Sequence, residues 1–311
     1  MTIDFNGRVA IVTGAGGGLG RHHALALAAR GARVMVNDLG SAADGSGGSV
    51  SAAQAVVAEI RAAGGEALAN GASVTDFAAV QAMVQQAVDA WGRVDILVNN
   101  AGILRDKTFA KMDLADFELV LKVHLMGAVH CTKAVWPIMN AQKYGRIVMT
   151  TSSTGLYGNF GQSNYGAAKM ALVGLMQTLA LEGAKNDIRI NCLAPTAATR
   201  MTEGLLPEAV LAAIKPEAVV PAMLVLASQD APNRTILCAG AGSFEAAHIT
   251  MTQGIWLGTD EQTPERLAEL LAEVTDRAGE RVPPNGSEQG SHEVAKAMIH
   301  ATQAAGRSGT R

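Results

Sequence analysis

The sequence has few cysteines, little net charge and no long apolar run. Its three cysteines, Cys131, Cys192 and Cys238, are an odd number in apolar contexts, which favours buried free thiols in a reducing compartment over a disulfide framework. The formal net charge is −3, and such a balance gives no reason to expect a nucleic acid or an anionic membrane as a partner. We therefore expect neither.

The apolar segments are shorter than a membrane-spanning helix requires. Such a helix needs about 18 apolar residues in succession, and the best candidate, residues 170–181, is interrupted by Gln177 and Thr178. A core or subunit-interface helix explains it better. The N-terminal region has Asp4 and a strand-like run instead of a basic segment before an apolar core, and residues 309–311 are no peroxisomal or lipidation signal. We expect a cytoplasmic location.

A glycine-rich turn follows the first apolar run, residues 8–12, and an alanine-rich helix follows the turn. In this arrangement of strand, turn and helix, Gly14 permits a sharp turn and Gly18 lets the backbone approach a diphosphate. Gly20 allows close packing of helix on strand, and Leu19 belongs to the same turn. The free N–H groups at the start of the helix attract an anion. The segment predicts a dinucleotide site.

Two histidines on this first helix are adjacent, at His22 and His23. Neighbouring residues on a helix point about 100° apart, so a shared metal ion is not expected. We predict that both lie on the helix surface, and we expect no metal site in the chain.

An acidic residue, Asp38, closes the second predicted strand, residues 33–37. A carboxylate in this position accepts hydrogen bonds from both ribose hydroxyls of an adenosine and repels a 2′-phosphate. This favours NAD over NADP. The alternative is that Asp38 only forms the turn before Leu39. Residues 41–49 are small and polar and predict a surface loop, longer than usual for its place, which suggests a lid or an interface flap.

Strands and helices alternate through the rest of the first 240 residues. We therefore predict an α/β fold, a Rossmann-like doubly wound parallel sheet with helices on both faces and ligands at the carboxyl ends of the strands. Further cofactor contacts are expected after three more strands: an adenine contact after residues 66–69, a close backbone approach after residues 94–98, and a carboxamide contact after residues 188–193. The residues concerned are Ser73 and Val74, then Asn100, Ala101 and Gly102, and finally Pro195, Ala197 and Thr199.

The pattern weakens beyond residue 240. We predict an NAD-binding catalytic domain over residues 1–240 and a C-terminal extension over residues 241–311, with helices at 264–278 and 292–304 and disorder at the end. The extension is expected to pack on a partner subunit or at the substrate entrance.

Three residues between positions 152 and 169 suggest the chemistry. Ser152 lies at a strand end, and Tyr165 and Lys169 are four positions apart, so they share one face of a helix. An ammonium near a phenol lowers the pKa of the phenol from about 10, the condition for a proton-transfer catalyst. Ser152 would hold a substrate oxygen against Tyr165. The alternative is a surface tyrosine and a solvated lysine that meet by chance.

Other residues are candidates for the same site. His124 lies among apolar residues of a long helical region, 113–140, where a structural role is the default and proton transfer behind the Tyr–Lys pair is the alternative. The loop between Ser152 and Tyr165 is expected to wall the substrate pocket through Leu156, Tyr157, Asn159 and Phe160.

With these motifs in this order, the sequence resembles the short-chain dehydrogenase/reductase superfamily over about its first 240 residues. Within it, residues 36–40, 99–106, 143–147 and 157–162 are similar to the (3R)-hydroxyacyl-CoA dehydrogenase units of peroxisomal multifunctional enzymes, which are also classed as 17β-hydroxysteroid dehydrogenases. The resemblance implies NAD, a homodimer or homotetramer, and catalysis by Ser152, Tyr165 and Lys169.

The sequence departs from the superfamily at two places. His124 stands where most members have Asn, and Pro195-Thr196 stands where many have Pro-Gly. The first departure concerns a proton relay assigned to that Asn, and the second concerns the contact with the nicotinamide.

The expected function is the interconversion of a secondary alcohol and a ketone by hydride transfer to or from NAD, with a 3-hydroxyacyl-CoA as first choice of substrate. The alternatives are a hydroxysteroid or another bulky hydrophobic alcohol and, from another class, a non-catalytic NAD-binding regulatory protein. Arg105 and Lys107 are candidates for contact with a CoA phosphate, although a solvated surface pair is the favoured interpretation.

Overall fold

The computed structural model describes residues 2–42, 44–198, 207–258 and 261–308. The chain divides into two compact units, residues 1–247 and residues 248–311. The sequence analysis placed this division after residue 240.

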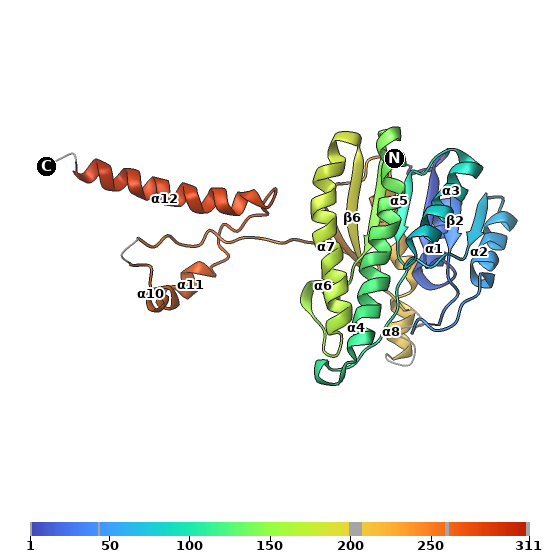
Figure 1. The fold of residues 1–311 in the computed structure, drawn as a ribbon, viewed down its shortest axis with the longest axis horizontal. Helices are drawn as coiled ribbons and strands as arrows, with labels where there is room; N and C mark the ends of the chain where they lie inside the picture. Colours follow the sequence, from blue (N-terminus) through green and yellow to red (C-terminus); the bar gives the residue numbers. More distant parts are fainter. Residues whose placement is uncertain (1, 43, 199–206, 259–260, 309–311) are drawn as a thin grey trace. The chain divides into compact units, whose positions relative to one another are not determined.

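The first unit is built on a sheet in which parallel pairing runs from β3 to β7 (Figure 1). Its strand order is β3-β2-β1-β4-β5-β6-β7-β8. The chain first adds β2 and β3 on one side of β1 and then adds β4 and the later strands on its other side, so the order of the strands reverses between β1 and β4. The predicted doubly wound fold is therefore confirmed. The strands are β1 Val9–Thr13, β2 Arg33–Asn37, β3 Ala67–Asn70, β4 Ile96–Asn99, β5 Gly145–Thr150, β6 Ile188–Thr196, β7 Ile236–Gly240 and β8 Ser243–Ala247.

β8 lies beyond residue 240, where the sequence analysis predicted no strand. This strand pairs antiparallel with β7 through a tight turn in which Ala241 and Gly242 have positive φ values of 51° and 81°. The strand is mostly exposed at the sheet edge, so it lacks the continuous apolar pattern of the buried strands and was hard to recognise.

The two faces of the sheet are covered by helices because successive strand side chains point to opposite sides. In β1, Ala10 and Val12 belong to one core cluster, and Val9 and Ile11 belong to the other. The first cluster includes residues from α1 Gly18–Ala28, α2 Ser51–Ala62 and α9 Val220–Ala227; the second includes residues from α3 Phe77–Trp91, α5 Gly127–Gln142 and α7 Ser163–Gly183 (Figure 1).

The expected long helix over residues 113–140 is divided into α4 Leu114–Leu121, a π-helical turn η2 Lys122–Met126, and α5. Asp113 caps its start by accepting a hydrogen bond from the Ala115 N–H at 3.0 Å. π-helical turns often occur at functional sites, and this one carries His124. The remaining helical segments of the first unit are η1 Phe109–Lys111, α6 Ser153–Tyr157, η3 Ala184–Asn186, α8 Glu208–Ala213 and η4 Pro216–Val219.

The prediction that both adjacent histidines lie on the surface of α1 is wrong. His22 is half-buried, whereas His23 is fully buried. Burial lowers the pKa of His23 to about 3, so the ring is neutral at pH 7. His23 lies one turn after Gly20 on the inner face of the helix, and its burial follows from packing that the polar character of histidine did not reveal.

The second unit contains α10 Pro264–Glu269, α11 Leu271–Val274 and α12 Ser287–Ser308. The expected helix at 264–278 is thus two short helices. An isolated antiparallel bridge joins Met251 to Arg281, and the ring of Trp256 stacks on His300 with centroids 4.3 Å apart.

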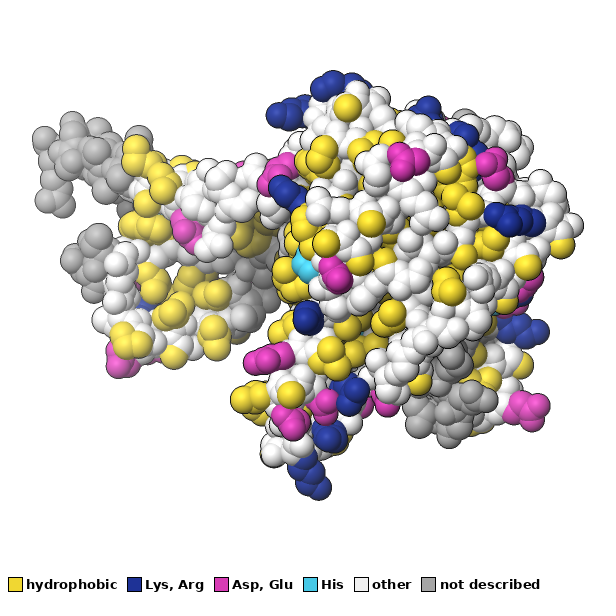
Figure 2. All heavy atoms as spheres, turned by 45° about the vertical axis from the view of Figure 1, so that its right-hand side comes forward, with side chains coloured by type: hydrophobic (Ala, Val, Ile, Leu, Met, Phe, Trp, Pro, Cys, Tyr) yellow, Lys and Arg dark blue, Asp and Glu magenta, His cyan; other side chains and the backbone are white. Residues whose placement is uncertain are grey.

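The surface of the first unit mixes charges of both signs with apolar side chains on the face shown in Figure 2. Among the helices that the structure describes, none combines the length and the apolar character needed to span a membrane.

A buried carboxylate, Asp95, ties together the amino-terminal ends of β1 and β4. Its oxygens accept two hydrogen bonds from Arg93 at 2.7 and 2.6 Å, one from Arg8 at 3.1 Å and one from the Val9 N–H at 2.9 Å. The side chain has no solvent exposure. All these donors would lose their acceptor together if the carboxylate were removed.

We expect Asp95→Ala to lower the free energy of unfolding by about 2–4 kcal/mol, because a buried backbone N–H and two guanidinium groups lose their partner. The measurement is urea denaturation followed by circular dichroism. The control is Asp230→Ala, an exposed residue, for which a change under about 0.5 kcal/mol is expected. Equal stability of the two variants would contradict the assigned role.

Candidate active site

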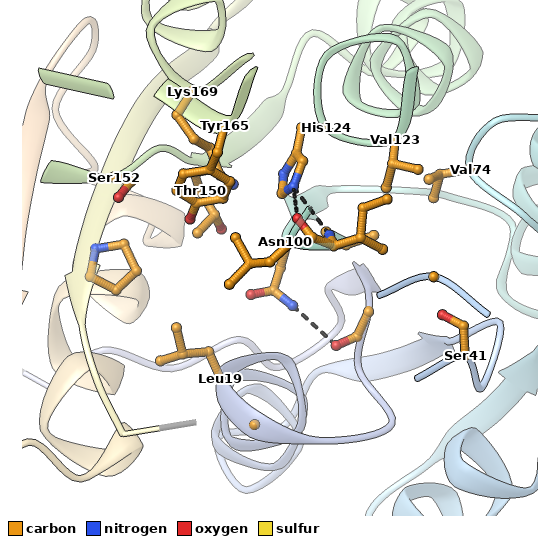
Figure 3. Close-up of a pocket in the computed structure, with 18 of the residues that line it drawn as sticks. Leu19, Ser41, Val74, Asn100, Val123, His124, Thr150, Ser152, Tyr165 and Lys169 are labelled. Atoms are coloured by element: carbon orange, nitrogen blue, oxygen red, sulfur yellow. Dashed lines mark hydrogen bonds between the residues drawn. The ribbon is translucent and has the colours of Figure 1, made fainter. Parts of the chain in front are cut away.

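A cleft of about 520 Å³ opens at the carboxyl ends of the strands. In Figure 3, Ser152, Tyr165 and Lys169 lie on one side of it and Leu19 lies on the opposite side. Most residues that the sequence analysis selected line this cleft: Gly14, Gly18, Leu19, Asp38, Ser73, Val74, Asn100, Ala101, Gly102, His124, Ser152, Asn159, Tyr165, Lys169, Pro195 and Ala197.

Among the described residues that were selected, Gly20, Leu156, Tyr157 and Phe160 do not line it. Gly20 packs beneath the turn, where an added Cβ would lie 2.2 Å from the Gly14 carbonyl oxygen. Tyr157 and Phe160 are 73% and 88% exposed and do not line the cleft, so the expected aromatic wall does not form in this structure. Tyr157 is the last residue of α6, and Phe160 lies between Gly158 and Gly161, which have positive φ values of 80° and 81°. This local backbone directs both rings outward. Thr199 lies outside the described residues.

The glycine turn fits the approach of a diphosphate. Gly14 and Gly18 have positive φ values of 63° and 50°, which favour glycine. No side chain caps the start of α1, whose N-cap is Gly17, so the first N–H groups of the helix are available to an anion.

Asp38 holds the turn and the following loop through both carboxylate oxygens. Oδ2 accepts a hydrogen bond from the Gly16 N–H at 2.7 Å, and Oδ1 accepts one from the Gly40 N–H at 2.6 Å. A Cβ at position 16 would lie 2.8 Å from the Asp38 Cγ. The carboxylate is therefore fixed at the edge of the cleft, beside the diphosphate turn.

The ends of β1 and β4 are joined by Thr13 and Asn100. The Thr13 hydroxyl accepts hydrogen bonds from the Asn100 and Ala101 N–H groups at 3.0 and 3.1 Å. The Asn100 Nδ2 donates to the carbonyl oxygens of Thr13 and Gly14, both at 3.0 Å, and its side chain is labelled in Figure 3. Asn100 therefore fixes the glycine turn to the neighbouring strand.

Tyr165 and Lys169 come together in the cleft on α7. The Lys169 Nζ lies 5.4 Å from the centroid of the Tyr165 ring and donates a hydrogen bond to the Thr150 carbonyl oxygen at 2.6 Å. Ser152 is buried and caps α6, and its hydroxyl accepts from the Thr154 N–H at 3.1 Å.

The electrostatics of the pair differ from the expectation that Lys169 lowers the pKa of Tyr165. Burial raises the pKa of Tyr165 above its ordinary value, while hydrogen bonding to Ser152 acts in the opposite direction and the charge of Asp106 adds to the rise. Burial also lowers the pKa of Lys169 to about 7. The lysine is therefore only partly charged at neutral pH, and among the described residues Ser152 is the group that favours the phenolate.

His124 is buried behind Tyr165. Its ring meets the Tyr165 ring edge to face, with centroids 5.2 Å apart, and its Nε2 lies 2.8 Å from the Ile103 carbonyl oxygen and 3.1 Å from the Ile103 N. Burial lowers the pKa of His124 to about 3, with the charge of Lys169 acting in the same direction. The imidazole is neutral at pH 7 and contacts Gly102, where a Cβ would lie 2.2 Å from Cε1.

Several lining residues were not selected from the sequence. Asp106, Thr154 and Gln162 form one polar wall, described further below, together with Asn159, which the sequence analysis did select. Leu104, Leu119, Val123 and Ile214 form an apolar wall. The loop of residues 41–49 also reaches the cleft through Ser41, Ala42 and Gly45, and the Arg105 Nε donates to the Asp44 carbonyl oxygen at 2.7 Å. The unusual length of that loop was the signal for its role.

Comparisons with known proteins show the family of this chain. The family model described as short chain dehydrogenase matches residues 8–209. The peroxisomal multifunctional enzyme type 2 of Drosophila melanogaster is 49% identical over 276 residues, which are 88% of this chain and 46% of that protein. Its full-length structure aligns with a TM-score of 0.79 over 96% of this chain and 50% of that chain. The chain thus spans about half the length of this relative.

Two solved structures of more similar length also align. A short chain dehydrogenase from Mycobacterium avium has 39% identity and a TM-score of 0.76, covering 88% of this chain and 96% of that one. A 7α-hydroxysteroid dehydrogenase, in complex with NADH and 7-oxo glycochenodeoxycholic acid, has 30% identity and a TM-score of 0.70, covering 77% of this chain and 95% of that one. The predicted family is confirmed: this chain is an oxidoreductase that belongs to the short-chain dehydrogenase family.

Proposed function

We propose that this enzyme uses NAD to interconvert a secondary alcohol and a ketone, with a 3-hydroxyacyl-CoA as its substrate. The observation that carries the proposal is the meeting of Ser152, Tyr165 and Lys169 in one cleft, opposite a glycine turn suited to a diphosphate. NAD, when bound, supplies the hydride acceptor for oxidation of the alcohol.

The protein supplies orientation and proton transfer. In its phenolate form Tyr165 takes the proton of the substrate hydroxyl during oxidation, and in its phenol form it gives that proton to the ketone oxygen during reduction. Its raised pKa makes the neutral phenol its resting form at pH 7, which suits donation to a ketone. Ser152 holds the substrate oxygen, and Lys169 holds the ribose next to the nicotinamide. The partly charged state of Lys169 lets it take part in proton exchange near neutral pH.

His124 is assigned a positioning role. A neutral imidazole bonded to the Ile103 backbone and packed against Tyr165 fixes the segment after β4 and the orientation of the phenol. This supports the structural alternative of the sequence analysis over direct proton transfer, because a group with a pKa of about 3 is a poor proton carrier at pH 7.

The residues that would hold the cofactor are the glycine turn with Leu19, Asp38 at the adenosine ribose, Val74 at the adenine, Asn100 to Gly102 along the backbone, and Pro195 with Ala197 near the carboxamide. Ser73 lies beside Val74, and Gly20 keeps α1 close to the turn. The preference for NAD over NADP is inferred from the fixed carboxylate of Asp38.

The choice of a 3-hydroxyacyl-CoA rests on the relatives named multifunctional enzyme type 2 and on the apolar lining at Leu104, Leu119, Val123 and Ile214. Arg105 and Lys107 both lie within ion-pair distance of Asp116, at 3.2 and 3.6 Å, which supports the surface-pair interpretation over a CoA phosphate site. A hydroxysteroid is the second candidate, because a hydroxysteroid dehydrogenase has a similar structure.

The non-catalytic NAD-binding alternative has less support, since a binding protein has no need for the Ser152, Tyr165 and Lys169 arrangement.

A homodimer or homotetramer stays a prediction from the resemblance. The packing of the C-terminal extension on a partner subunit or at the substrate entrance also stays a prediction. The cytoplasmic location also stays a prediction, and the names of several relatives include the word peroxisomal.

We expect Tyr165→Phe to lower kcat by about 10²–10⁴, because the substitution removes the proton donor and acceptor while keeping the ring. The dissociation constant of NAD is expected to change by less than about threefold, since the diphosphate and adenosine contacts remain. The measurements are NADH formation from a 3-hydroxyacyl-CoA and calorimetric titration with NAD. The control is Tyr144→Phe, at a buried residue that does not line the cleft, and it should keep its kcat. Ordinary turnover by Tyr165→Phe would refute the role of the phenol.

The lowered pKa of Lys169 makes stability depend on pH. The unfolded chain binds a proton at this lysine up to about pH 10.5, whereas the folded chain releases it near pH 7. Lys169 therefore destabilises the fold most at and below pH 7, and this cost disappears as the pH rises toward 10.5. Relative to Lys169→Met, the wild type should gain stability between pH 7 and pH 10, by up to about 1.4 kcal/mol for each pH unit.

Urea denaturation of both proteins across this pH range tests the prediction. Lys133→Met, at an exposed position of α5, is the control and should show a pH-independent difference from the wild type. A flat difference for Lys169→Met as well would contradict the shift.

We expect Asp38→Asn to lower the ratio of kcat/KM with NAD to kcat/KM with NADP by about tenfold or more, because repulsion of the 2′-phosphate is lost. Steady-state assays with both cofactors measure the ratio. Asp89→Asn, on the exposed surface of α3, should leave it unchanged, and an unaltered ratio in Asp38→Asn would argue against cofactor selection by this carboxylate.

A further inference from the structure

A polar wall of four side chains faces the same cleft as Ser152 and Tyr165. The wall consists of Asp106, Thr154, Asn159 and Gln162. Gln162 is its centre: its Nε2 donates to Asp106 Oδ2 at 2.6 Å, and its Oε1 accepts from Thr154 Oγ1 and from Asn159 Nδ2, both at 3.0 Å.

The partners fix the orientation of the Gln162 amide. A carboxylate only accepts hydrogen bonds, so the Gln162 atom that faces Asp106 must be the amide nitrogen. The amide oxygen is occupied by two donors. The amide nitrogen has two N–H bonds, and Asp106 uses one of them. Among the described residues, no acceptor takes the other, which leaves Gln162 one donor for a ligand in the cleft.

The negative charge of Asp106 is not neutralised by a described residue. Its sequence neighbours Arg105 and Lys107 pair with Asp116, and no described cation lies within ion-pair distance of Asp106. The carboxylate is exposed and lines the cleft, so it sets a negative potential directly beside the free donor of Gln162. A neutral carbonyl oxygen can accept from this donor, whereas an anionic carboxylate would also meet the charge of Asp106.

We propose that Asp106 and Gln162 determine specificity by selecting a 3-hydroxyacyl thioester over the free 3-hydroxy acid. Gln162 donates a hydrogen bond to the thioester carbonyl oxygen, which is two carbons from the reacting carbinol held by Ser152 and Tyr165. Asp106 orients Gln162 and repels a free carboxylate at the same position. This inference rests on the proposed dehydrogenase function and names the group that the enzyme recognises beside the reacting carbon.

The test compares two substrates that differ in this one group. The first is the N-acetylcysteamine thioester of 3-hydroxybutyrate, which lacks the phosphate charges of CoA, and the second is 3-hydroxybutyrate itself. For each enzyme, kcat/KM with saturating NAD gives a discrimination ratio of thioester over acid. Where turnover of the acid is too slow to follow, the acid is tested as an inhibitor of thioester oxidation. Its inhibition constant is then compared between the wild type and each variant.

We expect Asp106→Asn to lower the discrimination ratio by about tenfold, because an amide keeps an acceptor for Gln162 and removes the charge. Salt should have the same effect, because it screens an exposed charge. Raising the ionic strength should lower the discrimination ratio of the wild type and leave that of Asp106→Asn nearly constant. The matched control is Glu118→Gln, which removes an exposed charge on α4 outside the cleft and should leave the ratio unchanged.

A second variant tests the donor. Gln162→Leu should lower kcat/KM for the thioester by about tenfold or more and change that for the free acid much less. An unchanged ratio in Asp106→Asn, or an equal loss on both substrates in Gln162→Leu, would overturn the inference. Wild-type protein that oxidises no thioester with NAD would instead refute the proposed function, so the two failures are distinguishable.

Discussion

The hydrogen bonds between the ends of β1 and β4 are the constraint on which the cleft depends. Thr13 and Asn100 join two parallel strands where both end, and they bring the glycine turn against the segment that follows β4. The approach is so close that a Cβ on Gly14 would lie 2.8 Å from the Ala101 Cα. This contact therefore requires small residues on both strands. A ligand bound at this edge of the sheet can reach the ends of both β1 and β4.

Burial sets the chemistry on the opposite side of the cleft. Tyr165, Lys169 and His124 are all shifted toward their neutral forms, by loss of hydration. Each hydrogen bond is stronger in such a buried site than in water. The bond from Ser152 is therefore important, because it acts against the effect of burial on the pKa of Tyr165. The stability cost of a buried lysine is then part of what the site requires for function.

On the side of the cleft that holds Ser152 and Tyr165, the exposed carboxylate of Asp106 supplies a negative charge. The cleft thus combines a neutral, buried interior around the phenol with a negative, hydrated rim, and the Gln162 amide stands between them. This arrangement suits a substrate whose reacting group is uncharged and whose charged parts remain outside the cleft. Arg105 supports the rim from another direction, because it joins the loop of residues 41–49 to α4 through Asp44 and Asp116.

Local patterns in the sequence determined the fold class, the glycine turn, Asp38 and the meeting of Ser152, Tyr165 and Lys169. Apolar strands, the turns that follow them and helical spacing depend on neighbours in the chain, and parallel strands deliver their ends to one edge. Only the tertiary structure decided that Tyr157 and Phe160 turn outward, that His23 is buried, and that Asp106 meets Gln162. Those outcomes, like the direction of the pKa shift of Tyr165, depend on how segments far apart in the sequence exclude water from one another, and no local pattern records that exclusion.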